Sequence, residues 1–272
     1  MKKFWRILKK ILTITFTLSC AALFVVVLTS AVKKQDELTC KNLQVKIDYD
    51  SGLAFLNEGE ITERINFLSG ENIIGRPLSK IDFHTLEKEM EKNPYVCDAE
   101  IFVDHEQNII ITITQKRPIL RVINSDAESY YISEKNDHMP LNENFTMHLP
   151  IALGYVNMHT NPSRDSAVEN NLYVLANFIE HDVFLHALVD QVYVYENSEF
   201  DLIPKTGNHN IHFGNASENM ADKFKRLKIF YRDGLTKTGW FKYKSINLKF
   251  DGQVVCEKRD SIEASIAETQ NN

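Results

Sequence analysis

One stretch, residues 81–123, constrains the fold of this chain more than any other. Asp82 is a favourable residue to cap the start of a helix, and Leu86 and Met90 follow it at helical spacing on one face. Pro94 ends that helix, because proline has no amide hydrogen and disfavours helical backbone in the residue before it. The stretch therefore begins with a short amphipathic helix.

Two runs with alternating apolar residues follow this helix. Every second residue of 99–103 and of 109–113 is apolar, as in strands with one buried face. The polar residues 105–108 between them form a segment short enough for a hairpin loop. The stretch thus predicts a helix and then a hairpin, closed by Arg117-Pro118.

The sequence before this stretch adds a strand and another helix. Residues 43–49 alternate as a strand does. Asn57 begins a helix whose apolar stripe starts at Ile61, and Gly70 ends it. Residues 41–117 therefore predict one domain with the element order β-α-α-β-β, and the fold class of the chain is α+β.

The first residues of the chain predict a membrane anchor. Residues 11–32 contain no charge, and 22 residues are enough for a helix to span a bilayer core. Five basic residues and no acidic one among residues 1–10 predict a cytoplasmic N-terminus. We expect an uncleaved single span with a polar linker at 33–40. A cleavable signal peptide fits less well, because the apolar run exceeds the roughly 7–15 residues of such peptides.

The rest of the chain is acidic. The net charge of −6 includes the five positive charges of residues 1–10, so the remaining residues carry −11. An acidic domain of this kind argues against nucleic acid as a partner.

The four cysteines do not have the spacing of metal ligands or of a redox motif. Cys20 lies in the apolar segment, which leaves Cys40, Cys97 and Cys256, an odd number. We expect free thiols, with a disulfide between Cys40 and Cys97 as the alternative in an oxidising compartment.

From residue 118 the pattern changes to mostly β structure. Strands are expected at residues 119–123, 130–133, 192–195, 200–203, 211–213, 246–250 and 254–256, and an irregular segment at 139–141. Helices are expected at residues 168–179, 183–188 and 220–231, the last of them capped by Ser217. We assign residues 118–257 to a mostly antiparallel β domain with helices, and the polar residues 258–272 to a disordered tail.

Two segments resemble a known family. The motif NPYVCDAEIFV followed by NIIITITQKRPILRV, within residues 93–122, is similar to a POTRA domain, and specifically to that of the bacterial cell-division family FtsQ/DivIB. The segments PILRV, YYI and MPL, within residues 118–141, are similar to the start of the β domain in the same family.

The resemblance implies a non-enzymatic divisome scaffold that links cytoplasmic and periplasmic division proteins during septum formation. Its expected place is the inner membrane at the septum, with the N-terminus in the cytoplasm and the bulk of the chain in the periplasm. The implied partners are similar to FtsB and FtsL, together with FtsK-, FtsW- or FtsI-like proteins. No cofactor, metal, small-molecule ligand or nucleic acid is expected.

The same resemblance places an FtsB-binding surface at the end of the β domain. There, an exposed edge strand would pair with a strand of the partner. The residues implied are Leu248, Lys249, Phe250, Gly252, Val254 and Cys256. The alternative is that Phe250 is buried in the core of the domain with Ile246 and Leu248.

The sequence contains no convincing catalytic motif. Ser30-Ala31-Val32-Lys33 and two Lys-Thr-Gly triplets, at 205–207 and 237–239, match elements of penicillin-binding enzymes. However, Ser30 lies at the end of the expected span, where no cleft can surround it. His209 and His212 are three residues apart in an expected strand, so they face opposite sides and cannot share a metal ion.

A second function is a POTRA-containing envelope protein for outer-membrane or secretion assembly. POTRA domains in such systems usually occur in tandem, whereas this sequence shows one. That difference favours the division scaffold.

Overall fold

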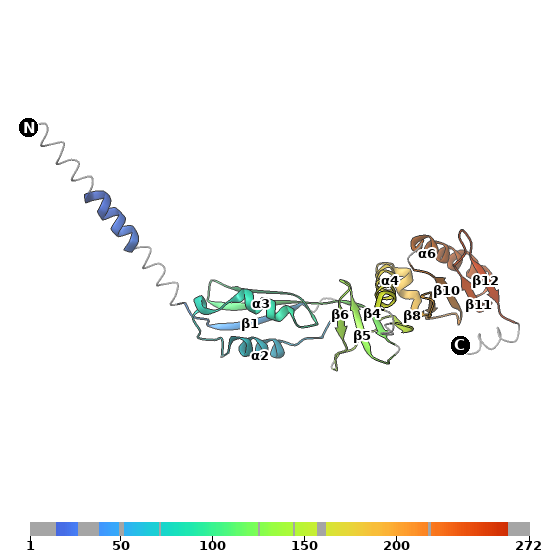
Figure 1. Ribbon diagram of the computed structural model, residues 1–272, viewed down its shortest axis with the longest axis horizontal. Helices are drawn as coiled ribbons and strands as arrows, with labels where there is room; N and C mark the ends of the chain where they lie inside the picture. The colour runs from blue at the N-terminus through green and yellow to red at the C-terminus, as the bar shows by residue number, and fades with distance from the viewer. Residues whose placement is uncertain are drawn as a thin grey trace, which may run out of the picture. The chain divides into compact units, whose positions relative to one another are not determined.

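The computed structural model divides the chain into two compact units, Met1–Gln115 and Lys116–Asn272, and each is described by itself (Figure 1). The structure describes residues 15–26, 38–48, 52–70, 72–124, 126–143, 145–156, 162–216 and 219–260.

The expected membrane span is only partly within these ranges. Residues 15–26 are helical with exposed side chains, whereas residues 1–14 and 27–37 lie outside the described ranges. Among the described residues, no helix combines the length and the apolar character needed to cross a membrane. The expected cap at Ser217 and the part of the expected tail from residue 261 also lie outside the described ranges.

The first unit contains a three-stranded sheet in the order β1-β3-β2. β1 (Asn42–Asp48) runs parallel to β3 (Asn108–Gln115), and β2 (Val96–Val103) runs antiparallel to β3. The helices α2 (Glu58–Ser69) and α3 (Phe83–Glu91) lie between β1 and β2 in the chain. This element order is the predicted β-α-α-β-β.

The helices of this unit begin and end where the sequence predicts. The side chains of Asn57 and Asp82 each accept a hydrogen bond from an amide three residues further on, which caps α2 and α3. Gly70 ends α2 with a φ of 76°, a backbone conformation that glycine adopts without strain. A 3-10 turn, η2 (Leu78–Lys80), leads into α3.

The core of the first unit is centred on β3. Ile109, Ile111 and Ile113 are fully buried, and Leu86 and Met90 of α3 are buried as well. α3 packs on β2 and α2 packs on β1. The alternation in the two predicted strands therefore marks the buried face correctly.

A buried amide also stabilises this unit. Gln115 is 5% exposed, and its side-chain oxygen accepts hydrogen bonds from the amides of Phe55 and Leu56. Its side-chain nitrogen donates to the carbonyls of Asp48 and Leu53. The side chain thus uses both acceptor sites and both donors, and it fixes residues 53–56 and the end of β1 against the end of β3.

The cysteines are free thiols, as expected from the sequence. Cys40 is buried, and Cys97 and Cys256 are partly buried. No disulfide joins Cys40 to Cys97.

Ile111→Ala should destabilise the first unit by about 2–5 kcal/mol, as buried large-to-small changes do. Ile111 is fully buried between Val45 and Ile101 on the neighbouring strands, so the shortened side chain leaves a cavity. Hydrogen exchange of the β3 amides measures the effect. Phe102→Ala is the control, because Phe102 is 47% exposed on β2. Equal effects of the two changes would contradict the face assignment.

The second unit contains a nine-stranded sheet in the order β12-β11-β10-β9-β8-β7-β4-β5-β6. The strands are β4 (Pro118–Ile123), β5 (Ser129–Ser133), β6 (His138–Pro140), β7 (Ile151–Gly154), β8 (Val189–Val194), β9 (Phe200–Pro204), β10 (Asn210–Gly214), β11 (Tyr243–Asn247) and β12 (Val255–Lys258). Most pairs are antiparallel, as predicted, but β4 with β7, β7 with β8, and β10 with β11 are parallel.

Helices cover one face of this sheet. They are α4 (Pro162–Glu180), α5 (Val183–Leu188), α6 (Met220–Ile229), a π-helical turn η3 (Phe230–Leu235) and the short α7 (Thr236–Thr238). Leu172, Leu185 and Phe224, from α4, α5 and α6, are buried in one core with strand residues such as Val192 and Leu202. The opposite face of the sheet therefore carries the alternate strand residues.

The structure corrects the predicted strands at several places. β7 was not predicted, and β6 forms where an irregular segment was expected. β11 ends at Asn247, because its side-chain oxygen accepts the amide hydrogen of Lys249 (2.9 Å) and turns the chain. β12 begins one residue later than predicted and includes Lys258, which the sequence assigns to the tail.

His209, just before β10, is a buried histidine with two partners. It is 1% exposed, its Nδ1 lies 3.0 Å from the carbonyl of Gly207, and its Nε2 lies 2.6 Å from the hydroxyl of Tyr231. Burial lowers the pKa of His209, and the charge of Arg259 lowers it further, whereas the hydrogen bond to Gly207 opposes both. The folded protein therefore favours the neutral imidazole.

The second unit should lose stability as the pH falls through about 6.5, where an unfolded histidine gains its proton. The pKa of His209 is lower in the folded protein, so the unfolded chain binds more protons below this pH. The free energy of unfolding therefore falls with decreasing pH, by at most about 1.4 kcal/mol per pH unit for one proton. Thermal unfolding between pH 8 and pH 5 measures it. His209→Gln should flatten the dependence, and His148→Gln, at an exposed position, should not. Parallel curves for wild type and His209→Gln would contradict the assignment.

Candidate partner-binding site

β12 is the last strand of the nine-stranded sheet, and within the described residues it pairs only with β11. The amide of Leu248 donates to the carbonyl of His212 in β10 (2.9 Å), so the backbone groups of Asn247 face β12. Asn247 lies opposite Val255, and the groups of Val255 therefore face β11. By the same alternation, the N–H and C=O of Cys256 point to the open edge.

The residues predicted to bind a partner do not all reach the surface. Leu248 is fully buried in the core, so its side chain is not available to a partner. Phe250 is 48% exposed, so the alternative in which it belongs to the core is wrong. Gly252 lies in a turn with a φ of 69°, and Val254 and Cys256 are partly buried against the core.

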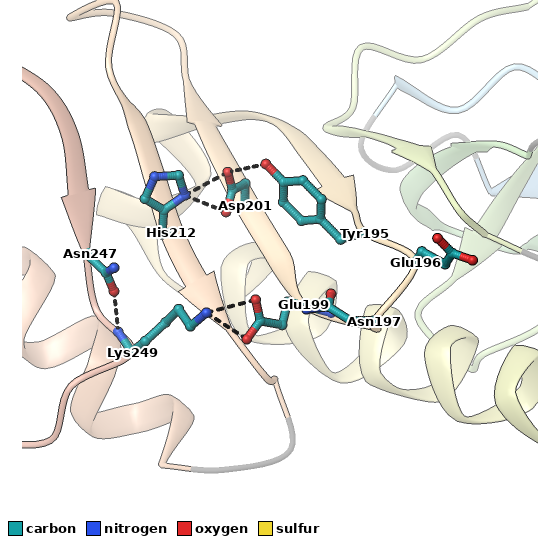
Figure 2. Close-up of a pocket in the computed structure, with 8 residues that line it drawn as sticks. All are labelled: Tyr195, Glu196, Asn197, Glu199, Asp201, His212, Asn247 and Lys249. Atoms are coloured by element: carbon teal, nitrogen blue, oxygen red, sulfur yellow. Dashed lines mark hydrogen bonds and ion pairs between the residues drawn. The ribbon is translucent and has the colours of Figure 1, made fainter.

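A cavity of about 650 Å³ opens beside residues 248–254, the loop between β11 and β12, which we call the edge loop (Figure 2). Its lining comes from the loop between β8 and β9, from β9 and β10, and from the end of β11. The lining residues are Tyr195, Glu196, Asn197, Glu199, Asp201, His212, Asn247 and Lys249. The cavity and the first residue of β12 lie at the same end of the sheet, because Asn247 lines the cavity and pairs with Val255.

Asp201 is the centre of the hydrogen bonds in this cavity. Its neighbours Phe200 and Leu202 are buried in the core, so Asp201 faces the opposite side of the sheet. Its carboxylate accepts a hydrogen bond from the hydroxyl of Tyr195 (2.9 Å) and another from Nδ1 of His212 (2.8 Å) (Figure 2). The residue is 4% exposed, so these bonds compensate for its burial.

Both partners of Asp201 donate a hydrogen bond to its carboxylate. Burial and then the hydrogen bond to Asp201 raise the pKa of Tyr195 to about 12, so its hydroxyl keeps its proton at neutral pH. Nδ1 of His212 lies 2.8 Å from the carboxylate of Asp201, and a carboxylate accepts hydrogen bonds, so Nδ1 is the donor in this contact.

Lys249, predicted as a charged contact for a partner, forms an ion pair within the chain. Its ammonium nitrogen lies 2.7 Å and 2.8 Å from the two carboxylate oxygens of Glu199. The hydrogen bond from Lys249 is the main cause that lowers the pKa of Glu199. Both side chains are about one-third exposed or more, so the pair orients the cavity wall more than it stabilises the fold.

Arg164 of α4 holds the loop between β8 and β9. Its guanidinium donates hydrogen bonds to the carbonyls of Tyr155, Tyr195 and Glu196 at 3.1–3.3 Å. Two of these contacts restrict the loop that carries the wall of the cavity, and the third joins that loop to Tyr155, the residue after β7.

The part of the chain that the structure describes contains no set of side chains suited to bind a metal ion. No group of three histidine, cysteine or carboxylate residues there could hold a metal ion. His209 contacts Tyr231, whereas His212 contacts Asp201 in the cavity, so the two histidines have separate surroundings, as their spacing predicts.

Comparison with protein families covers both units. Residues 117–257 match the family described as FtsQ/DivIB, C-terminal related, and residues 38–114 match a POTRA-like domain. The first match spans more than half of the chain. The chain belongs to the FtsQ/DivIB C-terminal related family. A search of the curated proteins finds no match.

The family resemblance expected from the sequence is thus confirmed. FtsQ/DivIB proteins form a non-enzymatic family of division proteins, and the two domains of this member indicate a scaffold role in cell division. Membership also indicates the division septum as its place and divisome proteins in general as its partners.

One residue of the FtsQ/DivIB-related domain organises the edge loop, and the sequence alone did not identify it. Arg226 of α6 donates to the carbonyls of Leu248 (3.2 Å), Phe250 (2.8 Å) and Gln253. Its Nε also bonds Asp222 one turn earlier (2.8 Å). Only this last contact, at i and i+4 on a helix, has a local sequence signal.

Arg226→Ala should loosen the loop between β11 and β12. We expect amide hydrogen exchange in residues 249–256 to accelerate roughly 10- to 100-fold, since hydrogen bonds to a charged group contribute about 1.5–3 kcal/mol each. Arg226→Lys should recover little, because an ammonium cannot span three carbonyls. Lys225→Ala, at the exposed neighbouring position, is the control. Unchanged exchange in Arg226→Ala would show that the loop is held by other contacts.

Proposed function

We propose that this FtsQ/DivIB family member is a non-enzymatic scaffold that links cytoplasmic and periplasmic division proteins during septum formation. The family match over residues 117–257 is the observation that carries the proposal. Residues 11–32 serve as a single span in the inner membrane, with residues 1–10 in the cytoplasm and the two domains in the periplasm. The uncharged run and the basic residues before it support this topology.

The proposed mode of binding is strand addition to β12 by a partner similar to FtsB, which acts together with an FtsL-like protein. An edge strand supplies main-chain hydrogen bonds, and the side chains around it supply specificity. The open edge at Cys256 and the exposed ring of Phe250 support this mode. Lys249, Gly252 and Val254 flank the edge, whereas Leu248 contributes by supporting the loop from within.

Cys256→Pro should abolish binding of the FtsB-like partner and leave the domain folded. The amide of Cys256 points to the open edge, so proline removes a hydrogen bond to the partner and none to β11. Val255→Pro is the comparison, because it removes an amide that faces Asn247 and should disturb the pairing of β12 with β11. Co-purification and thermal unfolding are measured for both. Normal partner binding by a folded Cys256→Pro protein would refute strand addition at this edge.

Depletion of the protein, followed by microscopy, tests the role in division. Long filaments with unconstricted division sites are the expected result. Loss of outer-membrane proteins, with division intact, would instead support the second function, envelope assembly through the POTRA-like domain. That domain at residues 38–114 is the observation that keeps the second function in consideration.

A further inference from the structure

Three aromatic rings of the second unit form a cluster whose outer members are exposed. Phe184 of α5 and Trp240, two residues after α7, each contact the ring of Tyr231 edge-on, with centroids 5.6 Å apart. Tyr231 is 2% exposed, whereas Phe184 is 36% and Trp240 is 40% exposed. Val183, the residue before Phe184, is 91% exposed. Large apolar side chains that gather at a surface indicate a contact site, so the question is what covers this one.

The chain leaves the sheet beside this cluster. Lys258, the last residue of β12, lies opposite Tyr243, and the amide of Arg259 donates to the carbonyl of Lys242 (2.9 Å). Because β12 is antiparallel to β11, the direction of the chain at this point runs along the residues that precede Lys242. The end of β12 is therefore directed toward Trp240.

The charge of Arg259 gives a second measure of this proximity. It lowers the pKa of His209, whose Nε2 lies 2.6 Å from the hydroxyl of Tyr231. Arg259 therefore lies close to the residues on which the cluster is built.

The surface around this point is basic, although the chain beyond its first ten residues is acidic. Residues 234–250 contain four lysines and no acidic residue, whereas residues 11–272 together carry a net charge of −11. Lys237, Lys242 and Lys244 are exposed, and within the described residues none of them forms an ion pair. An occupant with carboxylates on one side and apolar side chains on the other would match this surface.

The sequence that follows β12 has this complementary chemistry. Residues 260–272 contain three acidic residues and no basic one. Their two large apolar residues, Ile262 and Ile266, are four apart, a spacing that places both on one face of a helix. Asp260 and Glu263 have the spacing of a capping box, which favours a helix that begins here. So polar a segment is not expected to fold alone, and its two isoleucines need an apolar surface.

We propose that residues 261–272 dock as a short amphipathic helix on this aromatic cluster. Ile262 and Ile266 contact the exposed parts of Phe184 and Trp240, and the acidic residues face the exposed lysines. The segment continues directly from β12, so its effective concentration at the cluster is high and no second molecule is needed. Docking anchors the end of β12, because β12 then separates from β11 only when the segment is released as well.

Trp240 reports the contact in the full chain, kept in detergent micelles. The sequence has two tryptophans, so Trp5→Phe leaves Trp240 as the single one. Quenching of its fluorescence by acrylamide is compared with that in a variant that also carries Ile262→Ser and Ile266→Ser. Quenching should rise about twofold, because a contact with so short a connection is mostly formed in the unchanged segment. Ile74→Ser, at a 47% exposed position of the first unit, is the control. Equal quenching with and without the two isoleucines would overturn the proposal.

Reversal of charge tests the ionic part of the match. Glu263→Lys with Glu268→Lys places like charge against the lysines and should also increase the quenching of Trp240. Glu63→Lys with Glu91→Lys, at exposed positions of the first unit, makes the same change of net charge and should not. Equal quenching in these two variants would contradict the charge match.

A peptide of residues 260–272 identifies the occupant. Added to the chain with Ile262→Ser and Ile266→Ser, it should restore the protection of Trp240 in a saturable way. A peptide with the same two serines should not. Failure of the first peptide to protect Trp240 would overturn the proposal. Protection in the unchanged chain that is lost on dilution would assign the cover to a second copy, which also overturns it.

Hydrogen exchange tests the effect on β12. Ile262→Ser with Ile266→Ser should accelerate exchange of the β12 amides about fivefold and leave those of β9 unchanged, since only the end of the sheet is released. Unchanged exchange in β12 would contradict its anchoring by the segment. None of these measurements involves the FtsB-like partner, so they remain decisive even if the proposed function fails.

Discussion

The parallel pairing of β10 with β11 determines how the sheet of the second unit ends. Parallel neighbours need a crossover connection, and here α6 and η3 provide it. The crossover brings Arg226 to the loop that leaves β11. The same pairing aligns His212 with Asn247, so that both line one cavity. The open edge and the cavity therefore both follow from the parallel pairing of β10 with β11.

Elements with local determinants could be predicted from the sequence. Asn57, Asp82 and Gly70 fix the ends of the two helices in the first unit through caps that involve only adjacent residues. The sequence does not predict β7, because four residues are too few to show the alternation of a strand. The sequence does not predict the parallel pairs for a different reason. Which strands become neighbours depends on contacts between residues far apart in the chain.

In the candidate site, too, the sequence predicts the features with local determinants and misses those that depend on distant residues. The family resemblance located the edge, but alternation alone placed Ile246, Leu248 and Phe250 on one face of one strand. Leu248 is buried with Ile246, as alternation predicts, but the turn at Asn247 ends the strand, so Phe250 leaves that face and remains at the surface. In the cavity, the spacing of Glu199 and Asp201 indicates a shared strand face. No local pattern indicates that His212 and Lys249 join them, because that depends on how three strands are paired.

The order of the sheet has a consequence for how its end opens. β12 is held by a ladder of four residue pairs to β11, and it follows the other eight strands as a terminal addition. Separation of β12 therefore breaks one ladder and leaves the remaining ladders intact. A segment of this kind opens with a lower free energy than the whole domain, as a local cooperative unit. A ligand that binds the edge shifts only this small equilibrium, while the rest of the sheet remains a rigid support.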